Sequence, residues 1–247
     1  MRLSIVIPVL NSHEVVRRQL LHFERIGLPP DTEIILVDDG SDPPLAYRPT
    51  ENETLSHFVT IHRTHDKRPW TWALARNAGA RLAKGEYLLM FDLDHIVTRD
   101  ALDAVHGFDG LKVQFTREFG VLDENGVLTQ DRGVLEQYGL PRDKGLKLGP
   151  LPNNFAMQRE LFWKLGGYRE DLVEKPYPQG EDRAFRSVWR TFDPTGAKVG
   201  VHRPKMFMFP NGKYLGDVDA DPQGLFHGLT RKTHKNYWYQ EQKRAKS

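Results

Sequence analysis

The chain has 247 residues and no cysteine, which excludes disulfide bonds, thiolate zinc sites and cysteine nucleophiles. Its 35 Lys and Arg residues outnumber its 33 Asp and Glu residues by two, but the excess is unevenly distributed. Residues 231–247 contain six bases and one acid, a charge of +5, so the other 230 residues carry 29 bases and 32 acids, a charge of −3. This acidic body argues against a protein that coats nucleic acid, and the tail is a basic arm that could contact an acidic partner.

The length fits one large domain that can bury a sizeable core. Apolar runs such as Tyr87–Phe91 are far too short to cross a bilayer. The chain runs from Met1 almost directly into a strand-like segment, so no signal peptide is visible. We therefore expect a cytoplasmic protein without a transmembrane segment.

Four apolar segments in the first hundred residues predict buried strands: Leu3–Val9, Glu33–Val37, Phe58–His62 and Tyr87–Phe91. A first helix begins at Asn11, which forms a capping pair with Glu14, and is stopped by Gly27. A second helix covers Trp70–Lys84 and is stopped by Gly85, with an apolar face made of Leu74, Ala78 and Leu82. Strands that alternate with helices imply a mostly parallel sheet covered on both faces.

The pattern becomes less regular after Thr98. Asn125 and Gly126 between apolar residues predict a hairpin over Val121–Thr129. Asp131–Asn154 is rich in glycine, proline and charge, which predicts a long loop of the kind that often forms lids or binding loops. Further helices and short strands are predicted at Arg159–Leu165, Glu181–Arg190, Leu111–Thr116, Lys198–Val201 and Lys205–Phe209.

Acidic residues follow two of the predicted parallel strands, at the edge where such sheets bind ligands. Asp92 and Asp94 can face one hard cation such as Mg²⁺ or Mn²⁺, directly or through water. The alternative is a turn or a helix cap, but the position at the end of a strongly apolar strand favours the cation. Asp38 and Asp39 either close a turn by side-chain hydrogen bonds or accept the N–H of a pyrimidine base. Neither the G-x-G-x-x-G nor the Walker phosphate-binding pattern is present.

Six segments follow one another along the chain: SIVIPVLN (4–11), VDDGS (37–41), ARNAGA (75–80), GEYLLMFDLDHI (85–96), NNFAMQRELFWKLGGYRED (153–171) and GEDRAFRSVW (180–189). In their sequence and their order they resemble segments of family-two glycosyltransferases of the GT-A fold. The resemblance implies an α/β protein with a Rossmann-like, mostly parallel sheet flanked by helices and an irregular acceptor-binding second half. It also implies a single catalytic domain over 1–230, with a nucleotide-sugar-binding half at 1–105, an acceptor half at 106–230, and the basic tail beyond.

The resemblance implies a hexosyltransferase-like enzyme that uses a nucleotide-sugar, with UDP as the favoured nucleotide and Mn²⁺ or Mg²⁺ as the cofactor. It assigns seven residues to the donor. These are Pro8 and Asn11 at the base and ribose, Asp38 and Asp39 at the base, Arg63 at the nucleotide, Arg76 at the diphosphate, and Asp92 at the ribose or, through water, at the metal.

Asp182 stands where inverting members of the family carry the general base. A positioned carboxylate can accept the proton of a sugar hydroxyl, which is otherwise a weak nucleophile. Glu181 would then bind acceptor hydroxyls or support the loop. The alternative is that both acids only favour a helix N-terminus through its dipole, and the two interpretations are compatible.

The resemblance also implies that Asp94 binds the metal directly and that a histidine near the C-terminus completes the site. We favour His227 over His202, because His227 precedes a basic, aromatic stretch similar to the tail of several family members. A nitrogen ligand beside carboxylates favours Mn²⁺ over Mg²⁺. His95 is expected to point away from the site, since neighbouring residues of a strand alternate faces.

The acceptor is not specified by the sequence. Trp70, beside a basic loop, and Trp189, on the same helical face as Asp182, are candidates for stacking on a sugar, with a core position as the alternative for Trp189. A carbohydrate, a glycolipid or a protein fits the body, and the tail motivates a nucleic-acid acceptor as a minority hypothesis. The oligomeric state is equally unspecified.

Two rival classes remain to be weighed. A nucleotidyltransferase normally has a glycine- and arginine-rich loop after its first strand, and the segment Pro8–Asn11 argues against it. A non-catalytic module that binds a nucleotide or a sugar is disfavoured by the presence of both Asp94 and Asp182.

Overall fold

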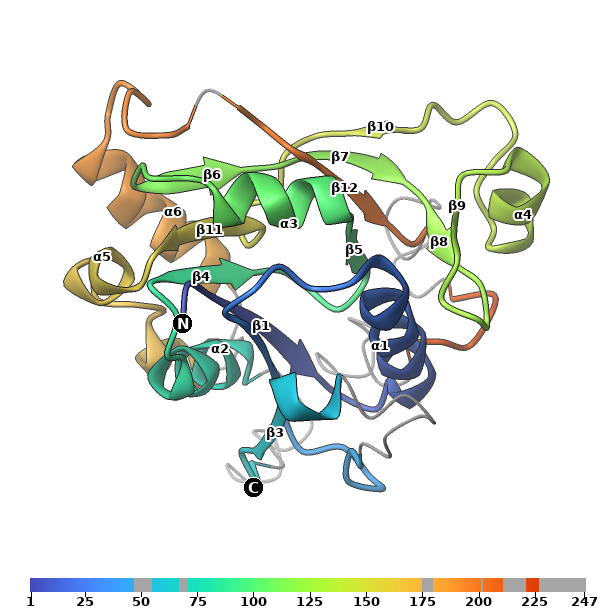
Figure 1. Ribbon diagram of the computed structural model, residues 1–247, viewed down its shortest axis with the longest axis horizontal. Coiled ribbons are helices and arrows are strands. Elements are labelled where there is room, and N and C mark those ends of the chain that lie inside the picture. Colours follow the sequence, from blue (N-terminus) through green and yellow to red (C-terminus); the bar gives the residue numbers. More distant parts are fainter. Residues whose placement is uncertain (47–54, 67–70, 175–179, 201, 211–220, 227–247) are drawn as a thin grey trace, which may run out of the picture.

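The computed structural model describes residues 1–46, 55–66, 71–174, 180–200, 202–210 and 221–226 (Figure 1). The predictions for Trp70, His227 and the tail at 231–247 therefore lie outside the described residues. Within the described ranges, none of the helices has the length and apolar character needed to cross a bilayer. The cytoplasmic location stays a prediction.

The central sheet has six strands in the order β3-β2-β1-β4-β11-β6. β1 is parallel to β2 and β4, and β2 to β3, whereas β11 is antiparallel to both β4 and β6. The bounds are β1 (Leu3–Val9), β2 (Thr32–Asp38), β3 (Val59–Arg63), β4 (Tyr87–Met90), β6 (Lys112–Gln114) and β11 (Phe155–Gln158). The first four predicted strands are confirmed within one residue at each end. β11 was missed because its four residues run directly into a helix and leave no strand pattern.

Helices cover both faces of this sheet, so β1 is buried on both sides. The odd-numbered residues of β1 lie in one core together with α1 (His13–Ile26). Val6 lies in a second core together with α2 (Trp72–Leu82). Figure 1 shows α1 and α2 on different sides of β1. The predicted α/β architecture with a mostly parallel, doubly covered sheet is confirmed.

The start of α1 differs from the prediction. Ser12 occupies the capping position and makes no side-chain capping bond. Asn11 instead has a left-handed φ of 48°, and its side-chain oxygen accepts the N–H of Asp42 at 2.8 Å. The predicted capping pair with Glu14 is therefore wrong. Gly27 ends α1 as predicted, at a φ of 69° that favours glycine.

Small residues let α2 approach the sheet closely. A Cβ at Gly79 would lie 2.4 Å from Cγ1 of Val6, so only glycine fits there. The predicted apolar face is confirmed for Leu74 and Ala78, which pack against the core, but not for Leu82, which is 42% exposed. The buried residues of α2 are Ala73, Ala75, Arg76, Asn77, Gly79 and Ala80. Gly85 lies beyond the helix end and serves packing instead, because a Cβ there would lie 2.5 Å from the backbone nitrogen of Ser4.

A second sheet has four strands in the order β10-β7-β12-β5 and contributes to the same core as α1. Its strands are β5 (His95–Val97), β7 (Thr116–Phe119), β10 (Lys147–Leu148) and β12 (Lys205–Met208). β12 is antiparallel to β5 and parallel to β7. The predicted hairpin is confirmed by the pairing of β8 (Val121–Leu122) with β9 (Leu128–Thr129).

Two predictions for the second half are wrong. The segment Asp131–Asn154 is not a continuous loop, since it contains β10 and α4 (Arg132–Gln137), which Asp131 caps by accepting the N–H of Val134 at 3.0 Å. The strand predicted at Lys198–Val201 is reduced, in its described part, to a single bridge between Val199 and Lys112.

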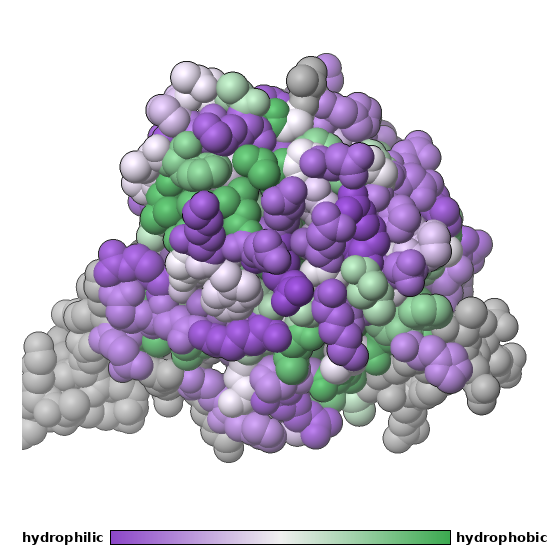
Figure 2. Space-filling view, turned by 60° about the vertical axis from the view of Figure 1, so that its left-hand side comes forward, coloured by the Kyte–Doolittle hydropathy of each residue, from purple (hydrophilic) through white to green (hydrophobic). Residues whose placement is uncertain are grey.

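The second core is closed by aromatic residues of the remaining helices. The other helical elements are η1 (Ser56–Phe58), α3 (Arg99–His106), α5 (Arg159–Lys164), η2 (Glu170–Glu174) and α6 (Glu181–Phe192). Trp189 of α6 is only 4% exposed, and the Lys112 ammonium lies 4.3 Å from its ring centroid. Trp189 therefore packs in the core, which favours the alternative given for it, and its role in stacking on an acceptor stays a prediction. The side that carries α5 and α6 is largely hydrophilic at its surface, with one hydrophobic cluster in the upper part of the view and further hydrophobic residues in the lower half (Figure 2).

Candidate functional site

The carboxyl ends of β1, β2 and β4 lie at one edge of the central sheet, and β11 begins there because it is antiparallel to β4. Asp92, Leu93 and Asp94 connect β4 to β5 at this edge. Leu93 is 4% exposed and anchors the connection in the core, whereas the side chains of Asp92 and Asp94 are 31% and 21% exposed. Both carboxylates therefore lie where parallel sheets bind ligands.

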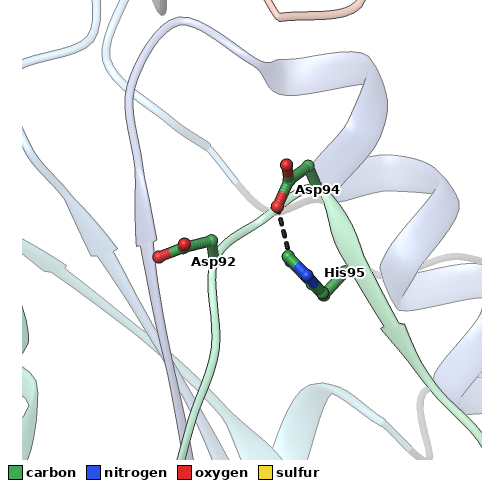
Figure 3. Close-up of side chains that lie close together, drawn as sticks. All are labelled: Asp92, Asp94 and His95. Atoms are coloured by element: carbon green, nitrogen blue, oxygen red, sulfur yellow. Dashed lines mark hydrogen bonds and ion pairs between the residues drawn. The ribbon is translucent and has the colours of Figure 1, made fainter. Parts of the chain in front are cut away.

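Asp92, Asp94 and His95 form the one group of three potential metal-ligating side chains among the described residues, with ligand atoms within 4.8 Å of one another. Nδ1 of His95 lies 2.6 Å from Oδ1 of Asp94, and Figure 3 shows these two side chains facing each other. The expectation that His95 points away is therefore wrong. Carboxylate oxygens are the donors that Mn²⁺ and Mg²⁺ prefer, so the donor set fits either ion.

A buried arginine joins this group to α6. Arg76 of α2 is 3% exposed, pairs through Nη2 with Asp92, and donates through Nη1 to Glu181 at 3.3 Å. Its guanidinium lies 5.4 Å from the ring centroid of Tyr168. Burial alone would lower the pKa of Arg76, but the negative charges of Asp92 and Glu181 raise it above its ordinary value. Arg76 is thus a buried link between Asp92 and Glu181, and its predicted contact with the diphosphate stays a prediction.

The two acids that open α6 have different surroundings. Gly180 precedes them with a φ of 98°, a conformation that favours glycine. Glu181 is 7% exposed, and burial raises its pKa against the opposing effect of Arg76. Asp182 is half-buried and accepts the N–H of Arg183 at 2.7 Å. Within the part of the chain that the structure describes, Asp182 forms no ion pair, so its carboxylate is the more available of the two.

Asp38 closes the turn that follows β2. Its Oδ1 accepts the N–H of Ser41 at 2.9 Å and its Oδ2 accepts that of Leu45 at 2.7 Å. Because both oxygens accept backbone N–H groups, the turn interpretation is supported, and the nucleotide contact of Asp38 stays a prediction. Asn11 lies across from this turn and donates its N–H to the Ser41 hydroxyl at 2.9 Å, while Pro8 is buried within β1.

Asp39 is a buried carboxylate held by hydroxyl groups. Its Oδ2 accepts from Thr71 at 2.6 Å and its Oδ1 from Thr64 at 3.2 Å. Burial raises the pKa of Asp39 to about 7, and the two hydroxyl bonds oppose the rise. Arg63, at the end of β3, is exposed and donates to the carbonyl of Leu45 at 3.0 Å. The predicted base contacts of Asp39 and Arg63 stay predictions.

Three buried polar residues near this edge were missed by sequence reasoning. Gln19 donates to the carbonyls of Leu93 and His95, and Nη1 of Arg117 lies 2.9 Å from Nε2 of His95. Asn154 immediately precedes β11 and is 3% exposed, and neither its Nδ2 nor its Oδ1 has a hydrogen-bond partner among the described residues. The pair of asparagines at 153–154, directly before an apolar run, was the sole local signal for a buried polar residue there. The alternative ligand His202 is exposed and does not belong to the group of Asp92, so its predicted metal role is not supported.

The fold and the site together define a GT-A protein, and two solved structures share this fold. A mannosyltransferase from Pyrobaculum calidifontis, in complex with GDP-Man and Mn²⁺, aligns with a TM-score of 0.54 at 18% identity over 99% of this chain and 73% of that one. S. aureus TarS 1-349 in complex with UDP aligns with a TM-score of 0.53 at 15% identity over 98% of this chain and 70% of that one.

The chain belongs to glycosyl transferase family 2, whose profile matches residues 4–166. A curated relative is the poly(ribitol-phosphate) beta-glucosyltransferase of Bacillus spizizenii, which is 36% identical over 105 residues. That match covers 41% of this chain and 16% of the relative, so the chain spans a small part of the relative's length. Sequence family and fold therefore agree with the resemblance noted in the sequence.

Proposed function

We propose that this chain transfers a sugar from a UDP-sugar to an acceptor hydroxyl, with inversion at the anomeric carbon. One observation carries the proposal. Arg76 binds both Asp92 and Glu181, which brings the start of α6 next to the D-x-D residues. Inverting transfer needs a cation site for the leaving diphosphate and a base for the acceptor in one place, and Asp182 directly follows Glu181.

Asp92 and Asp94 would hold Mn²⁺ or Mg²⁺, which when bound neutralises charge that develops on the departing diphosphate. Asp182 accepts the proton of the acceptor hydroxyl as the new C–O bond forms and the bond from the anomeric carbon to the diphosphate breaks. Asp182 suits this role better than Glu181, because Glu181 is 7% exposed and already bound to Arg76. Asp39, at the end of β2, is the candidate contact for the base.

The reaction class is tested by a screen of nucleotide-sugars for Mn²⁺-dependent release of the nucleoside diphosphate. We expect turnover with a UDP-sugar and a product of inverted anomeric configuration, measured by NMR. Binding of the donor without turnover, across a broad acceptor panel, would instead support a non-catalytic module.

The base assignment is tested with Asp182→Asn. We expect transfer to fall by at least about 100-fold while UDP affinity stays within about twofold, because the base acts on the acceptor and not on the nucleotide. Asp171→Asn is the matched control: this acid lies in η2, its side chain is 55% exposed, and it pairs with Arg169 on the surface. Full transfer by Asp182→Asn would remove the assignment.

The acceptor panel should contain carbohydrates, glycolipids and proteins. A poly(ribitol-phosphate) belongs in it because the name of the Bacillus relative specifies that polymer. A nucleic-acid acceptor, motivated by the charge of +5 over residues 231–247, predicts binding that weakens steeply with salt. Acceptor binding that does not change with salt concentration would exclude a nucleic-acid acceptor.

A further inference from the structure

A buried histidine holds the carboxylate of Asp94 from inside the protein. His95 opens β5 and is 1% exposed, and its Nδ1 lies 2.6 Å from Oδ1 of Asp94. β5 pairs with β12, with His95 opposite Met208, so the ring is held within the four-stranded sheet. One oxygen of Asp94 is therefore engaged by a rigid, inward-facing group.

A second buried residue lies behind the ring. Arg117 of β7 is 3% exposed, and its Nη1 lies 2.9 Å from Nε2 of His95. Nε and Nη2 of the same guanidinium both donate to the carbonyl of Gly149, the former at 2.8 Å. A guanidinium can only donate hydrogen bonds, so Nε2 of His95 must accept. The ring hydrogen therefore sits on Nδ1 and is donated to Asp94.

The backbone of the same segment is fixed independently. Gln19 of α1, 1% exposed, donates through Nε2 to the carbonyl of His95 at 2.5 Å and to that of Leu93 at 3.2 Å. The N–H of Phe209 donates to the carbonyl of Asp94 at 2.9 Å. The Asp94 carboxylate can still rotate about this fixed backbone, and the hydrogen bond from His95 restricts that rotation.

We propose that His95 and Arg117 are positioning residues for the cation site, an inference that rests on the proposed function. Arg117 selects the ring tautomer, and His95 then directs the Asp94 carboxylate toward the position beside Asp92. His95 is not itself a ligand, because both ring nitrogens are already engaged. Partners of this kind orient metal-binding carboxylates, and losing them typically weakens metal binding by about 10- to 100-fold.

Two variants distinguish the contact of the His95 ring with Asp94 from its contact with Arg117. In His95→Asn the amide can occupy the place of Nδ1 and still donate to Asp94. In His95→Gln the amide reaches the place of Nε2 and faces Arg117 instead. The affinity for Mn²⁺, alone and with UDP, is measured from the electron paramagnetic resonance signal of free Mn²⁺. We expect about 10-fold or greater weakening in His95→Gln and less than about threefold in His95→Asn.

His22 provides the matched control. It is 2% exposed, and its ring nitrogens lie 3.0 Å from the carbonyl of Val97 in β5 and 3.1 Å from that of Gly126. His22→Gln should therefore lower thermal stability about as much as His95→Gln, while Mn²⁺ affinity stays unchanged. Equal loss of Mn²⁺ affinity in both variants would reduce His95 to a structural role and overturn the proposal.

Arg117→Met tests the tautomer step, since the ring of His95 can then carry its hydrogen on either nitrogen. We expect Mn²⁺ binding to weaken about threefold to 10-fold in the otherwise unchanged protein and hardly at all in the His95→Asn background. If Arg117→Met weakens Mn²⁺ binding equally in the unchanged protein and in the His95→Asn background, Arg117 does not act through His95. Wild-type affinity in His95→Gln would overturn the positioning role alone, whereas no Mn²⁺ binding by the unchanged protein would overturn the proposed function as well.

Discussion

The two carboxylates of the D-x-D segment are held by different chemistry on opposite sides of the central sheet. On the α2 side, Asp92 pairs with the guanidinium of Arg76, which also binds Glu181. On the side of the four-stranded sheet, Asp94 accepts from the imidazole of His95. The first arrangement balances full charges, so removing one member leaves the others uncompensated. The bond from His95 directs one oxygen of Asp94, so its loss should affect the geometry of the metal ligands more than the free energy of unfolding.

The largest effect is expected on the charged side. Arg76→Met leaves Asp92 and the buried Glu181 without their shared cation, and breaking a buried pair in this way typically costs about 3–5 kcal/mol. Urea denaturation at pH 7 measures the loss in the free energy of unfolding. The change also frees the start of α6 from the D-x-D residues, so transfer should fall with it.

Arg81→Met is the control for Arg76→Met, because Arg81 lies on the same helix and also pairs with an acid. Its side chain is 54% exposed and that of its partner Glu170 is 36% exposed. Exposed pairs contribute about 0–1 kcal/mol. Equal losses in the two arginine variants would contradict the distinction between a buried charged link and a surface pair.

The parts of the fold with a strong local pattern were predictable. The four apolar strands, the glycine that ends α1 and the Asn-Gly hairpin all follow from a few adjacent residues. The acids at the strand ends were located for the same reason, since a strand end fixes which edge of the sheet its next residues occupy.

The contacts of the site were not predictable, because they join segments far apart in the chain. Arg76 was assigned to the diphosphate, but its burial beside Asp92 and Glu181 depends on the close approach of α2 to the sheet at Gly79. His95 was expected to alternate away from Asp94, but it turns inward because β5 pairs with β12, and β7 then brings Arg117 behind its ring. No pattern of neighbouring residues encodes such a three-strand contact.

Asp39 extends the comparison to a carboxylate held by hydroxyl groups. Because burial raises the pKa of Asp39 to about 7 from its ordinary value of 3.8, the folded protein binds the proton more tightly than the unfolded chain. The stability gained from this proton is complete below pH 4 and is lost as the pH rises to 7. At about 1.4 kcal/mol per unit the loss approaches roughly 4 kcal/mol.

Asp39→Asn removes the titrating group and should therefore gain stability relative to the unchanged protein as the pH rises. Urea denaturation of both proteins at pH 4 and pH 8 isolates this difference from all other titrating groups. UDP affinity should fall in the same variant if Asp39 contacts the base. A stability difference that is the same at both pH values would show that the Asp39 carboxyl is not perturbed by burial.

Asn154 is the last member of this series: within the part of the chain that the structure describes, neither polar atom of its buried side chain has a partner. Asn77 of α2 is its counterpart: 2% exposed, it donates to the carbonyl of Tyr168 at 2.8 Å and accepts that residue's N–H at 3.0 Å. An unpaired buried group costs about 1–3 kcal/mol, whereas a paired one contributes roughly 1 kcal/mol and leaves its partners unsatisfied when removed.

The same substitution should therefore have opposite signs at the two positions. Asn154→Leu should raise the free energy of unfolding of the ligand-free protein by about 1 kcal/mol, and Asn77→Leu should lower it by about 2 kcal/mol. Urea denaturation of both variants provides the comparison. If both variants lower the free energy of unfolding, Asn154 must also lose a hydrogen bond when it is replaced. Its partner would then be ordered water.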